Sequence, residues 1–572
     1  TQSEQQINEL QQHAQSVEEK IKLLLIQMNL VELRGQYLES IDVLLSGLTL
    51  LDVNIPRNEQ QQADELGQLL QELPSRFEDI SAQNLIETSE TENPHHLLVM
   101  RLLMRLWTPC YITGQRNLLA LVSIYLVNYS LKHGRSEITP FAYCSFALVY
   151  GFLKNDHCLA YQFGLAGAEL AKECDNLVVR NRSYFLFSIS INNWQNPVSK
   201  SRYWLEKAFE CAVEAGDQVY ACYAAYYLIT DGFIQGRALT EVAADCRLYL
   251  AFLEKESTPL FNIALSFCRT IENTCDEDVG YTFDQLQFLK DHHHIPVFMS
   301  GYDFGSLCSR FWSDQHSDLE SIAQNTLMSV PANLHGTLKV PETLFLSSMS
   351  FLQCHSKSPL ENWDALQATI HHNQQQLKLY TDNCTSNYLH KYLLIQAELA
   401  ILDNQPLEAM DLFEAAIETA GESHVIHIEA LANERYARFW ISQNRTQIAA
   451  IYIKRAHYLY FHWGNRAKTQ GLESEFKELL ENPTYPSFSS HDNTETLGSQ
   501  SGEVNESATS TNLDQQLDWL SALKASQAIM ENIQSENLAH ELIKIMAENT
   551  GASKAMLLLQ EADELVVSAV YP

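Results

Sequence analysis

Apolar residues recur at spacings of three and four along the chain from residue 1 to about residue 482. This spacing is the period of an amphipathic α-helix, because residues three and four apart lie on one helix face. Glycine and proline are sparse, at 21 and 15 in 572 residues, which disfavours a turn-rich all-β fold. The pattern therefore predicts a mostly α chain. One such stretch contains Ile21, Leu24, Leu25, Met28 and Val31.

Short breaks separate the helical stretches. Helices paired through tight turns are the unit of an α-solenoid, and the chain is too long for one core. We therefore expect a TPR-like α-solenoid of paired antiparallel helices over residues 1–482, with a partner surface on its concave face. The breaks are Arg34-Gly35, Asn155-Asp156, Ala215-Gly216-Asp217, Asn404-Gln405-Pro406 and Gly464-Asn465.

A tetratricopeptide pattern can be tested residue by residue. The second helix of each unit places small, large and small residues at spacings of four and three, because helices cross closely only where side chains are small. From Ala409 to Ala449 is 40 residues, against about 34 for the ideal repeat, so a degenerate array is expected and an irregular helical domain is the alternative. The matches are Ala409, Phe413 and Ala416; Ala449, Ile453 and Ala456; Ser40, Leu44 and Gly47; Ser201, Leu205 and Ala208; and, on a first helix, Ala437 and Trp440.

The composition changes after Asn482. Residues 483–512 are rich in Ser, Thr, Asn, Glu and Gly, and cannot bury enough apolar surface to fold, so a disordered linker is predicted. Residues 513–535 form an amphipathic pattern with heptad-like leucines, which suggests a signalling helix and a possible homodimer. Residues 536–572 predict a helix, then strands at Ala555–Gln560 and Leu565–Tyr571, the incomplete start of an α/β domain.

Charge and cysteine usage exclude several classes of protein. The net charge of -33, from 71 acidic and 38 basic residues, repels nucleic acid and anionic membranes. The longest apolar run, about Leu118 to Val127, is too short to cross a bilayer. The twelve cysteines form no C-x-x-C pair, so reduced thiols in a cytoplasmic protein are expected. Those at Cys144, Cys158, Cys222 and Cys268 lie in apolar stretches and are expected to be buried.

The chain offers no recognised catalytic motif. It has no phosphate loop, no H-E-x-x-H and no G-x-S-x-G, and no H-R-D, D-F-G or G-x-G-x-x-G follows a strand. The consecutive histidines of Asp291–His294 and of His371-His372 point in different directions on a helix, so they predict polar helix surface rather than a metal site. Tyr223, Tyr226 and Tyr227 predict core packing. We expect no catalytic, cofactor-binding or metal-binding residue in this chain.

Several packing motifs can be compared with known families. They are Met100–Leu103, Ala120–Val122, Leu126-Val127, Ser130–Gly134, Ala142-Tyr143, Tyr161–Gly164 with Ala168, Leu523–Ile529, Gly551-Ala552 and Ala555–Leu559. Together they resemble large bacterial multi-domain signalling kinases. In that family a serine/threonine kinase-like domain and an AAA/STAND NTPase precede helical repeats, and a GAF domain and a histidine kinase follow them. The resemblance implies that residues 536–572 begin a GAF-like domain.

The sequence thus predicts a regulatory protein-interaction segment of a multi-domain sensor histidine or serine/threonine kinase. The repeats would bind a protein or peptide and couple upstream modules to the GAF-like sensor, with no cofactor and no catalysis in this segment. The start at Thr1 and the end at Pro572 suggest a piece of a longer, ATP-dependent kinase. The alternatives are a free-standing TPR-like scaffold and an enzyme with an unrecognised helical site.

Overall fold

The computed structural model describes most of the chain, in two compact units. The described residues are 10, 14, 16–33, 36–76, 80–91, 93–256, 260–275, 277–315, 317–334, 336–481, 555–561 and 564–571. The units are Thr1–Tyr485 and Pro486–Pro572, and each is described by itself. The predicted linker 483–512 and the predicted helix 513–535 lie outside the described residues, and the proposed domain boundaries stay predictions.

The first part of the helical unit consists of helices connected by short turns. Most of them pack against the next helix along the chain, and α3 also packs on α6. These elements are α2 (Val17–Leu33), α3 (Tyr37–Thr49), α4 (Glu59–Arg76), α5 (Ala82–Ile86), α6 (Pro94–Ile112), α7 (Arg116–His133), α8 (Thr139–Lys154) and α9 (His157–Glu173).

The middle part contains one irregular passage. The helix that begins as α10 passes into a π-helical turn and two short 3-10 turns before α11 begins. These elements are α10 (Leu177–Leu186), η1 (Phe187–Ile191), η2 (Asn192–Trp194), η3 (Val198–Lys200), α11 (Ser201–Ala215), α12 (Gln218–Ile234), α13 (Leu239–Lys255) and α14 (Leu260–Cys275).

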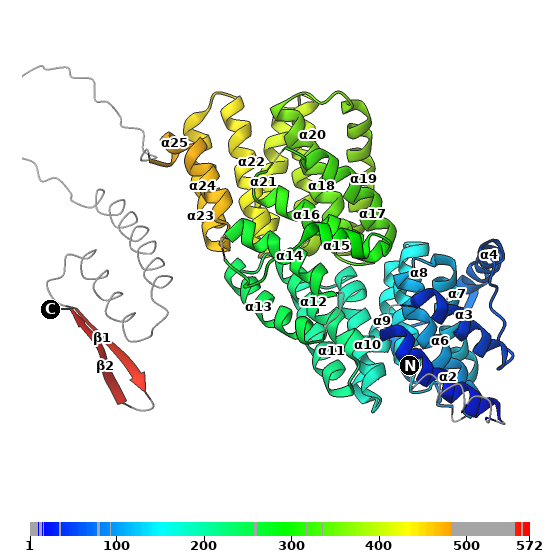
Figure 1. The fold of residues 1–572 in the computed structure, drawn as a ribbon. Coiled ribbons are helices and arrows are strands. Elements are labelled where there is room, and N and C mark those ends of the chain that lie inside the picture. The colour runs from blue at the N-terminus through cyan, green and yellow to red at the C-terminus, as the bar shows by residue number, and fades with distance from the viewer. Residues whose placement is uncertain are drawn as a thin grey trace, which may run out of the picture. The chain divides into compact units, whose positions relative to one another are not determined.

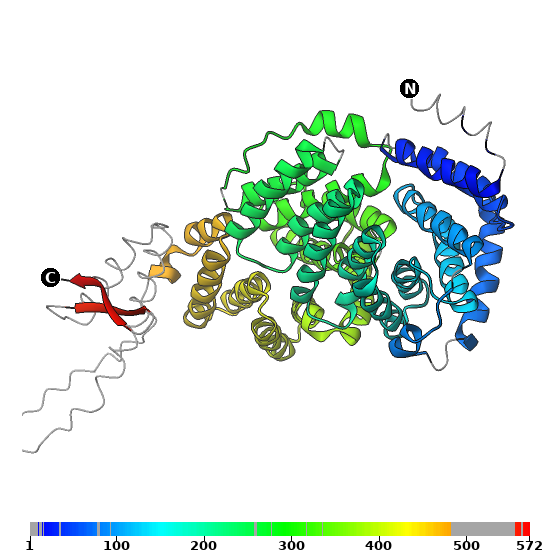
Figure 2. The same cartoon turned by 90° about the horizontal axis from the view of Figure 1, so that it is seen from below.

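The last part is the most regular. Helices α18–α23 run side by side in Figure 1, and Figure 2 shows the same elements from below. The elements are α15 (Gln285–His292), α16 (Pro296–Trp312), α17 (Leu319–Asn333), α18 (Lys339–Lys357), α19 (Trp363–Asn383), α20 (Thr385–Leu402), α21 (Pro406–Glu422), α22 (Ile426–Ser442), α23 (Thr446–Trp463), α24 (Arg466–Glu475) and α25 (Lys477–Glu481).

The predicted breaks are real helix ends. Asn155, Gly216, Asn404 and Gly464 each adopt a positive φ between 54° and 95°, the left-handed conformation that terminates helices. Glycine and asparagine reach this conformation at the least steric cost, which is why the breaks could be read from the sequence. The break at Arg34-Gly35 lies outside the described residues.

The repeat residues lie at the helix contacts, as predicted. The predicted small and large residues on α3, α11, α21 and α23 are all buried, and α20/α21 and α22/α23 form closely packed pairs. On α22, Ala437 is fully buried and Trp440 is half-buried. The prediction of TPR-like paired helices is therefore confirmed.

Helices α8 and α18 are surrounded on all sides along most of their length. Every residue of α8 from Thr139 to Gly151 and of α18 from Lys339 to Gln353 is buried. A helix buried all round belongs to the interior of a protein rather than to a one-sided layer. The array therefore has a packed interior, whereas a simple open solenoid would expose one side of each inner helix.

The cysteines are free thiols, as the sequence predicted. Cys144, Cys222 and Cys268 are buried, but Cys158 is exposed, and for that residue the prediction of burial was wrong. Cys158 is the second residue of α9, and the first turn of that helix is close to the chain reversal at Asn155. An apolar neighbourhood in sequence did not determine which side of the first turn faces the core.

A conservative change in the repeat contact should have a moderate cost. Phe413 is fully buried and stacks on Tyr436 with ring centroids 5.1 Å apart. We expect Phe413→Leu to lower the free energy of local opening of α21 and α22 by about 1–2 kcal/mol, measured by hydrogen exchange. Leu407→Ala, on the same helix at 76% exposure, should change it by less than about 0.5 kcal/mol. Equal effects of the two changes would contradict this assignment of the contact.

The described part of the second unit is a β-hairpin. Strands β1 (Ala555–Glu561) and β2 (Glu564–Tyr571) pair antiparallel, from Ala555 opposite Tyr571 to Glu561 opposite Glu564. The register is irregular between Leu557 and Leu558. Both strands lie where the sequence predicted them. Strand β1 ends one residue later than predicted, and β2 begins one residue earlier. The assignment to a GAF-like domain stays a prediction, because the remainder of 536–572 lies outside the described residues.

Candidate functional site

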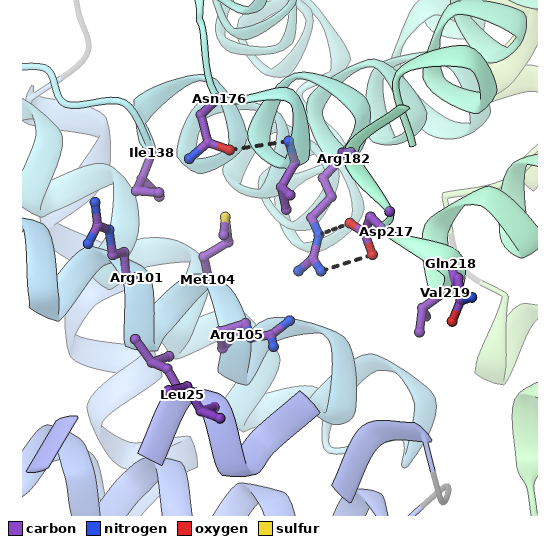
Figure 3. Close-up of a pocket in the computed structure, with 14 residues that line it drawn as sticks. Leu25, Arg101, Met104, Arg105, Ile138, Asn176, Arg182, Asp217, Gln218 and Val219 are labelled. Atoms are coloured by element: carbon purple, nitrogen blue, oxygen red, sulfur yellow. Dashed lines mark hydrogen bonds and ion pairs between the residues drawn. The ribbon is translucent and has the colours of Figure 1, made fainter. Parts of the chain in front are cut away.

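A pocket lined by three arginines lies between α2, α6, α10 and the start of α12. Its volume is about 530 Å³, within the range of binding sites for small molecules or side chains. Figure 3 shows Arg105 from α6 and Arg182 from α10 reaching into the same hollow. This arginine pocket is lined by Leu25, Ile26, Arg101, Met104, Arg105, Ile138, Asn176, Val178, Arg182, Ala215, Gly216, Asp217, Gln218 and Val219.

Helix α6 positions two of the arginines. Arg101 and Arg105 are four residues apart, so they lie on one face of the helix, while residues such as Leu102 and Leu103 are fully buried on other faces. Arg101 forms an ion pair of 2.6 Å with Glu137. Partial burial by itself raises the pKa of Glu137. Hydrogen bonds from Arg101 and Asn176 outweigh this effect and hold the pKa below its ordinary value.

The third arginine is almost completely buried. Arg182 is 3% exposed, donates hydrogen bonds of 2.8 and 3.3 Å to the two carboxylate oxygens of Asp217, and lies over the ring of Tyr220. Both oxygens of Asp217 are therefore engaged, and this residue makes no side-chain cap for α12, the helix that it precedes. The first amide groups of α12, at Gln218 and Val219, belong to residues of the pocket wall.

The positive charges of the pocket come from its arginines, of which Arg101 is paired with Glu137 and Arg182 with Asp217, and from the start of α12. An uncapped helix start carries partial positive charge, and guanidinium groups match carboxylate geometry. Guanidinium groups stay protonated at neutral pH, so the arginines supply hydrogen-bond donors and charge rather than a general base. The chemistry of the pocket is therefore binding.

A second region of interest is the row of helices α18, α20 and α22. Buried ion pairs lie along this row: Lys391 with Glu342, Arg435 with Glu398, and Lys468 with Glu434. In each of these three pairs both side chains are no more than 11% exposed. Buried charges need partners, since an unpaired charge in the interior costs several kcal/mol.

Other contacts tie this row to the earlier helices. Lys339 of α18 donates a hydrogen bond of 2.9 Å to Thr230 of α12, and its ammonium lies 3.7 Å from Asp231. Burial raises the pKa of Asp231 to about 6 and lowers the pKa of Lys339 to about 8, against their mutual attraction. Trp463 of the neighbouring α23 donates a hydrogen bond to the carbonyl of Arg237, so this helix is also tied to the earlier part of the chain. The inner helices are therefore joined by buried ion pairs and hydrogen bonds, and the prediction of a partner surface on a concave face stays a prediction.

Two clefts remain at the ends of the row. The first has a volume of about 540 Å³ and lies at the starts of the three helices, where Leu338, Thr385 and Val425 line it. The second has a volume of about 450 Å³ and lies at their ends, with Arg435, Arg438 and Glu475 in its wall. Both clefts are hollows beside the inner row, in the part of the chain that the structure describes.

The residues singled out in the sequence do not converge on a site. Helix α15 ends at His292, which is buried against Phe288, so for this histidine the prediction of polar helix surface was wrong. His371 and His372 are exposed on α19, as predicted. Within the described residues, no group of three or more His, Cys, Asp or Glu side chains is placed to hold a metal ion.

The tyrosines pack in the interior, as predicted. Tyr226 and Tyr227 are each 6% exposed, and Tyr223 is half-buried. All three line a small cavity, whose wall also includes Trp107 and Phe185, and the ammonium of Lys339 lies 3.8 Å from the ring centroid of Tyr227.

One triplet resembles a kinase motif by its letters alone. Asp303, Phe304 and Gly305 lie within α16, where Phe304 is fully buried and Gly305 contacts Phe267. A metal-binding D-F-G sits in a loop, so this helical triplet does not act as one. The pocket residues missed by the sequence analysis include the three arginines, for which the signal available was the spacing of Arg101 and Arg105 on one helix face.

The helical geometry can be compared with known proteins. Residues 337–482 match the family of CHK1-like TPR repeats. This match covers α18 to α25, the part in which the helix pairs and the buried ion pairs are most regular. In the described parts of the chain, no helix combines the length and apolar character required to cross a membrane.

A similar protein is the hybrid signal transduction histidine kinase G of Dictyostelium discoideum. It is 27% identical over 166 residues, which cover 28% of this chain and 5% of that protein. The aligned region is thus a small part of a much longer kinase. The resemblance noted in the sequence was to bacterial kinases, and a bacterial source stays a prediction.

Proposed function

We propose that this chain is a regulatory protein-interaction segment of a multi-domain signal-transduction kinase. The observation that carries the proposal is the array of TPR-like helix pairs at 337–482, in a chain similar to part of a histidine kinase. TPR-like arrays commonly present surfaces for peptides and partner domains. The coupling of upstream modules to a GAF-like sensor, and cytoplasmic location, belong to this proposal.

The two clefts of the inner row supply the contact surface in this scheme. A partner that occupies the first cleft touches α18, α20 and α22 together, so its binding energy depends on how these helices are spaced. A change in spacing at one end can then be transmitted along the row, through helices that are already tied by ion pairs. The segment itself binds and positions a partner, while phosphotransfer belongs to other modules of the kinase.

A free-standing scaffold is the second candidate, favoured by the absence of a recognised kinase motif in this sequence. The coding sequence on either side separates the two candidates. Kinase-like and histidine kinase modules in the same reading frame support the first, and their absence supports the scaffold.

Cross-linking in host extract tests the proposed partner surface. The full chain is compared with Val425→Arg, in the wall of the first cleft, and with Leu407→Arg, a charge-matched control on exposed α21 surface. We expect a defined host protein to cross-link to the chain and to the control, and to be depleted about tenfold with Val425→Arg. Equal cross-linking by both variants, or ATP turnover by the chain alone, contradicts the proposal.

A further inference from the structure

A small cavity inside the helical unit combines an aromatic wall with two hydroxyl groups that have no partner. This aromatic cavity has a volume of about 60 Å³, and side chains of α6, α10, α12 and α16 line it, among them Trp107, Phe185, Tyr226 and Phe298. We infer that it binds a small neutral molecule with an apolar body and one hydroxyl or carbonyl group. Such a ligand is separate from the protein partner proposed for the clefts of the inner row, and its binding does not depend on that partner.

The two hydroxyl groups define the polar part of the ligand. Ser190 is 1% exposed and Tyr226 is 6% exposed, and among the residues that the structure describes neither hydroxyl has a hydrogen-bond partner. A buried polar group without a hydrogen bond is unfavourable, and native proteins leave few of them. By contrast, the hydroxyls of Thr108 and Tyr220 in the same wall bond to each other at 2.9 Å. Ser190 and Tyr226 are therefore the groups that a ligand in the cavity would satisfy.

An irregular helical turn places Ser190 in the wall. Ser190 belongs to the π-helical turn η1, and its neighbour Ile189 lines the same cavity. Turns of this kind are rare and occur frequently at functional sites. The turn between α17 and α18 lies close by, because a Cβ atom at Gly336 would be 3.6 Å from the Oγ atom of Ser190. The hydroxyl is thus held between two turns of the backbone.

The wall disfavours a charged ligand. In the part of the chain that the structure describes, none of the residues that line the cavity is acidic or basic. Aromatic rings can attract a cation, but the ammonium of Lys339 already lies 3.8 Å from the ring centroid of Tyr227 and 4.9 Å from that of Tyr226. A second cation would be repelled by this ammonium. An anion would lose its hydration without gaining a free partner, since Lys339 lies 3.7 Å from Asp231.

The volume and the apolar wall define the rest of the ligand. One water molecule needs about 10–15 Å³, so the cavity has room for roughly four to six non-hydrogen atoms. Besides the aromatic rings, the wall presents aliphatic side chains such as Leu148, Ile263 and Leu334. Each buried water typically makes about three hydrogen bonds, and two hydroxyls satisfy several waters poorly. An aliphatic body packs against the wall instead, while its polar end reaches Ser190 and Tyr226.

The cavity approaches the protein surface at one rim. Tyr111, Tyr223 and Val297 line it and are half-buried, so a ligand can enter when these side chains rotate, without separation of the helices. The three residues belong to α6, α12 and α16, which are distant in sequence. A bound ligand therefore stabilises the arrangement in which these helices pack together. No small-molecule site was expected from the sequence, because the wall forms only when these helices meet.

Three molecules of the same branched shape test the inference: isobutanol, isopentane and isobutylammonium. Their binding to the full chain is followed by ligand-detected NMR. The variants Ser190→Ala and Tyr226→Phe each remove one hydroxyl of the cavity, and the matched control Ser145→Ala removes a buried hydroxyl outside it, which is bonded to the carbonyl of Ala142. We expect the full chain to bind isobutanol, each cavity variant to weaken this binding about fivefold, and Ser145→Ala to change it by less than about twofold. Isopentane should bind to the cavity variants at least as tightly as to the wild type.

Thermal unfolding of the ligand-free variants separates loss of binding from loss of fold. Because Ser190→Ala and Tyr226→Phe remove hydroxyls that have no partner in the described residues, both variants should be at least as stable as the wild type. Three results would overturn the inference: no binding of isobutanol to the full chain, an equal effect of Ser145→Ala and the cavity variants, or equal binding of isobutylammonium and isobutanol. The first would identify a cavity that holds at most water, and the last would identify a cation site. Each of them leaves the proposed protein partner of the inner row unaffected.

Discussion

Replacing Lys468 with alanine is expected to destabilise the C-terminal helices of the array by about 3–5 kcal/mol. Lys468 is 1% exposed and its ammonium lies 3.2 Å from Glu434 and 3.0 Å from Asp314. Burial by itself raises the pKa of Glu434, but the positive charges of Lys468 and Arg438 hold this pKa at about 2. Without the lysine, a buried carboxylate loses its main partner, and the cost is that of an uncompensated charge.

The sign of the pH dependence follows from the lowered pKa of Glu434. A depressed carboxyl pKa contributes stability that is present above the ordinary range near 4.5 and is lost as the pH falls toward about 2. In Lys468→Ala this contribution shrinks, so the difference in stability between wild type and variant should be largest at neutral pH. It should narrow as the solution is acidified through that window.

Lys477→Ala is the matched control for this change. Its ion pair with Glu481 spans 3.8 Å and both side chains are about two-thirds exposed or more, so its loss should cost less than about 1 kcal/mol. Hydrogen exchange on the amides of α22 to α25 measures both effects locally, which suits a long array that need not unfold in one step. A loss for Lys468→Ala no larger than for Lys477→Ala would show that the buried network is not important for stability.

Replacing Gly167 with valine should separate α8 from α9, at a cost of about 3 kcal/mol. A Cβ atom at Gly167 would lie 2.6 Å from the carbonyl oxygen of Pro140 and 2.7 Å from the sulfur of Cys144. The first of these neighbours is backbone, so it cannot rotate away. Because α8 is buried on all sides, its displacement disturbs packing with α7 and α10 as well.

Replacing Gly67 of α4 with alanine should have the opposite effect and raise the stability of the protein. A Cβ atom at Gly67 meets nothing within 4 Å, so alanine should stabilise that helix by about 0.5–1 kcal/mol through its better helix propensity. Thermal unfolding of the two variants should therefore move in opposite directions. Equal destabilisation by the two would contradict the close approach of α8 and α9.

Much of the helical fold could be predicted from the sequence. The spacing of Ala409, Phe413 and Ala416 gives both a helix and its contact face, because a helix period and a need for small residues at a crossing are local properties. The turns at Gly216 and Gly464 could be recognised for the same reason, since left-handed backbone favours glycine. Only the coarse family resemblance is supported by the comparisons, and the sensor domain stays a proposal.

The binding features could not be predicted, because they join residues that are distant in sequence. Arg105 and Arg182 line one pocket although they are far apart in sequence, and Lys468 meets Asp314 across 154 residues. A buried arginine or lysine looks like a surface residue in the sequence, since its partner appears only after the helices have packed. The sequence by itself determined the period, the ends and the contact faces of the helices. The tertiary structure decided which buried charges pair between the inner helices and that three arginines line one pocket, because both depend on how distant helices pack.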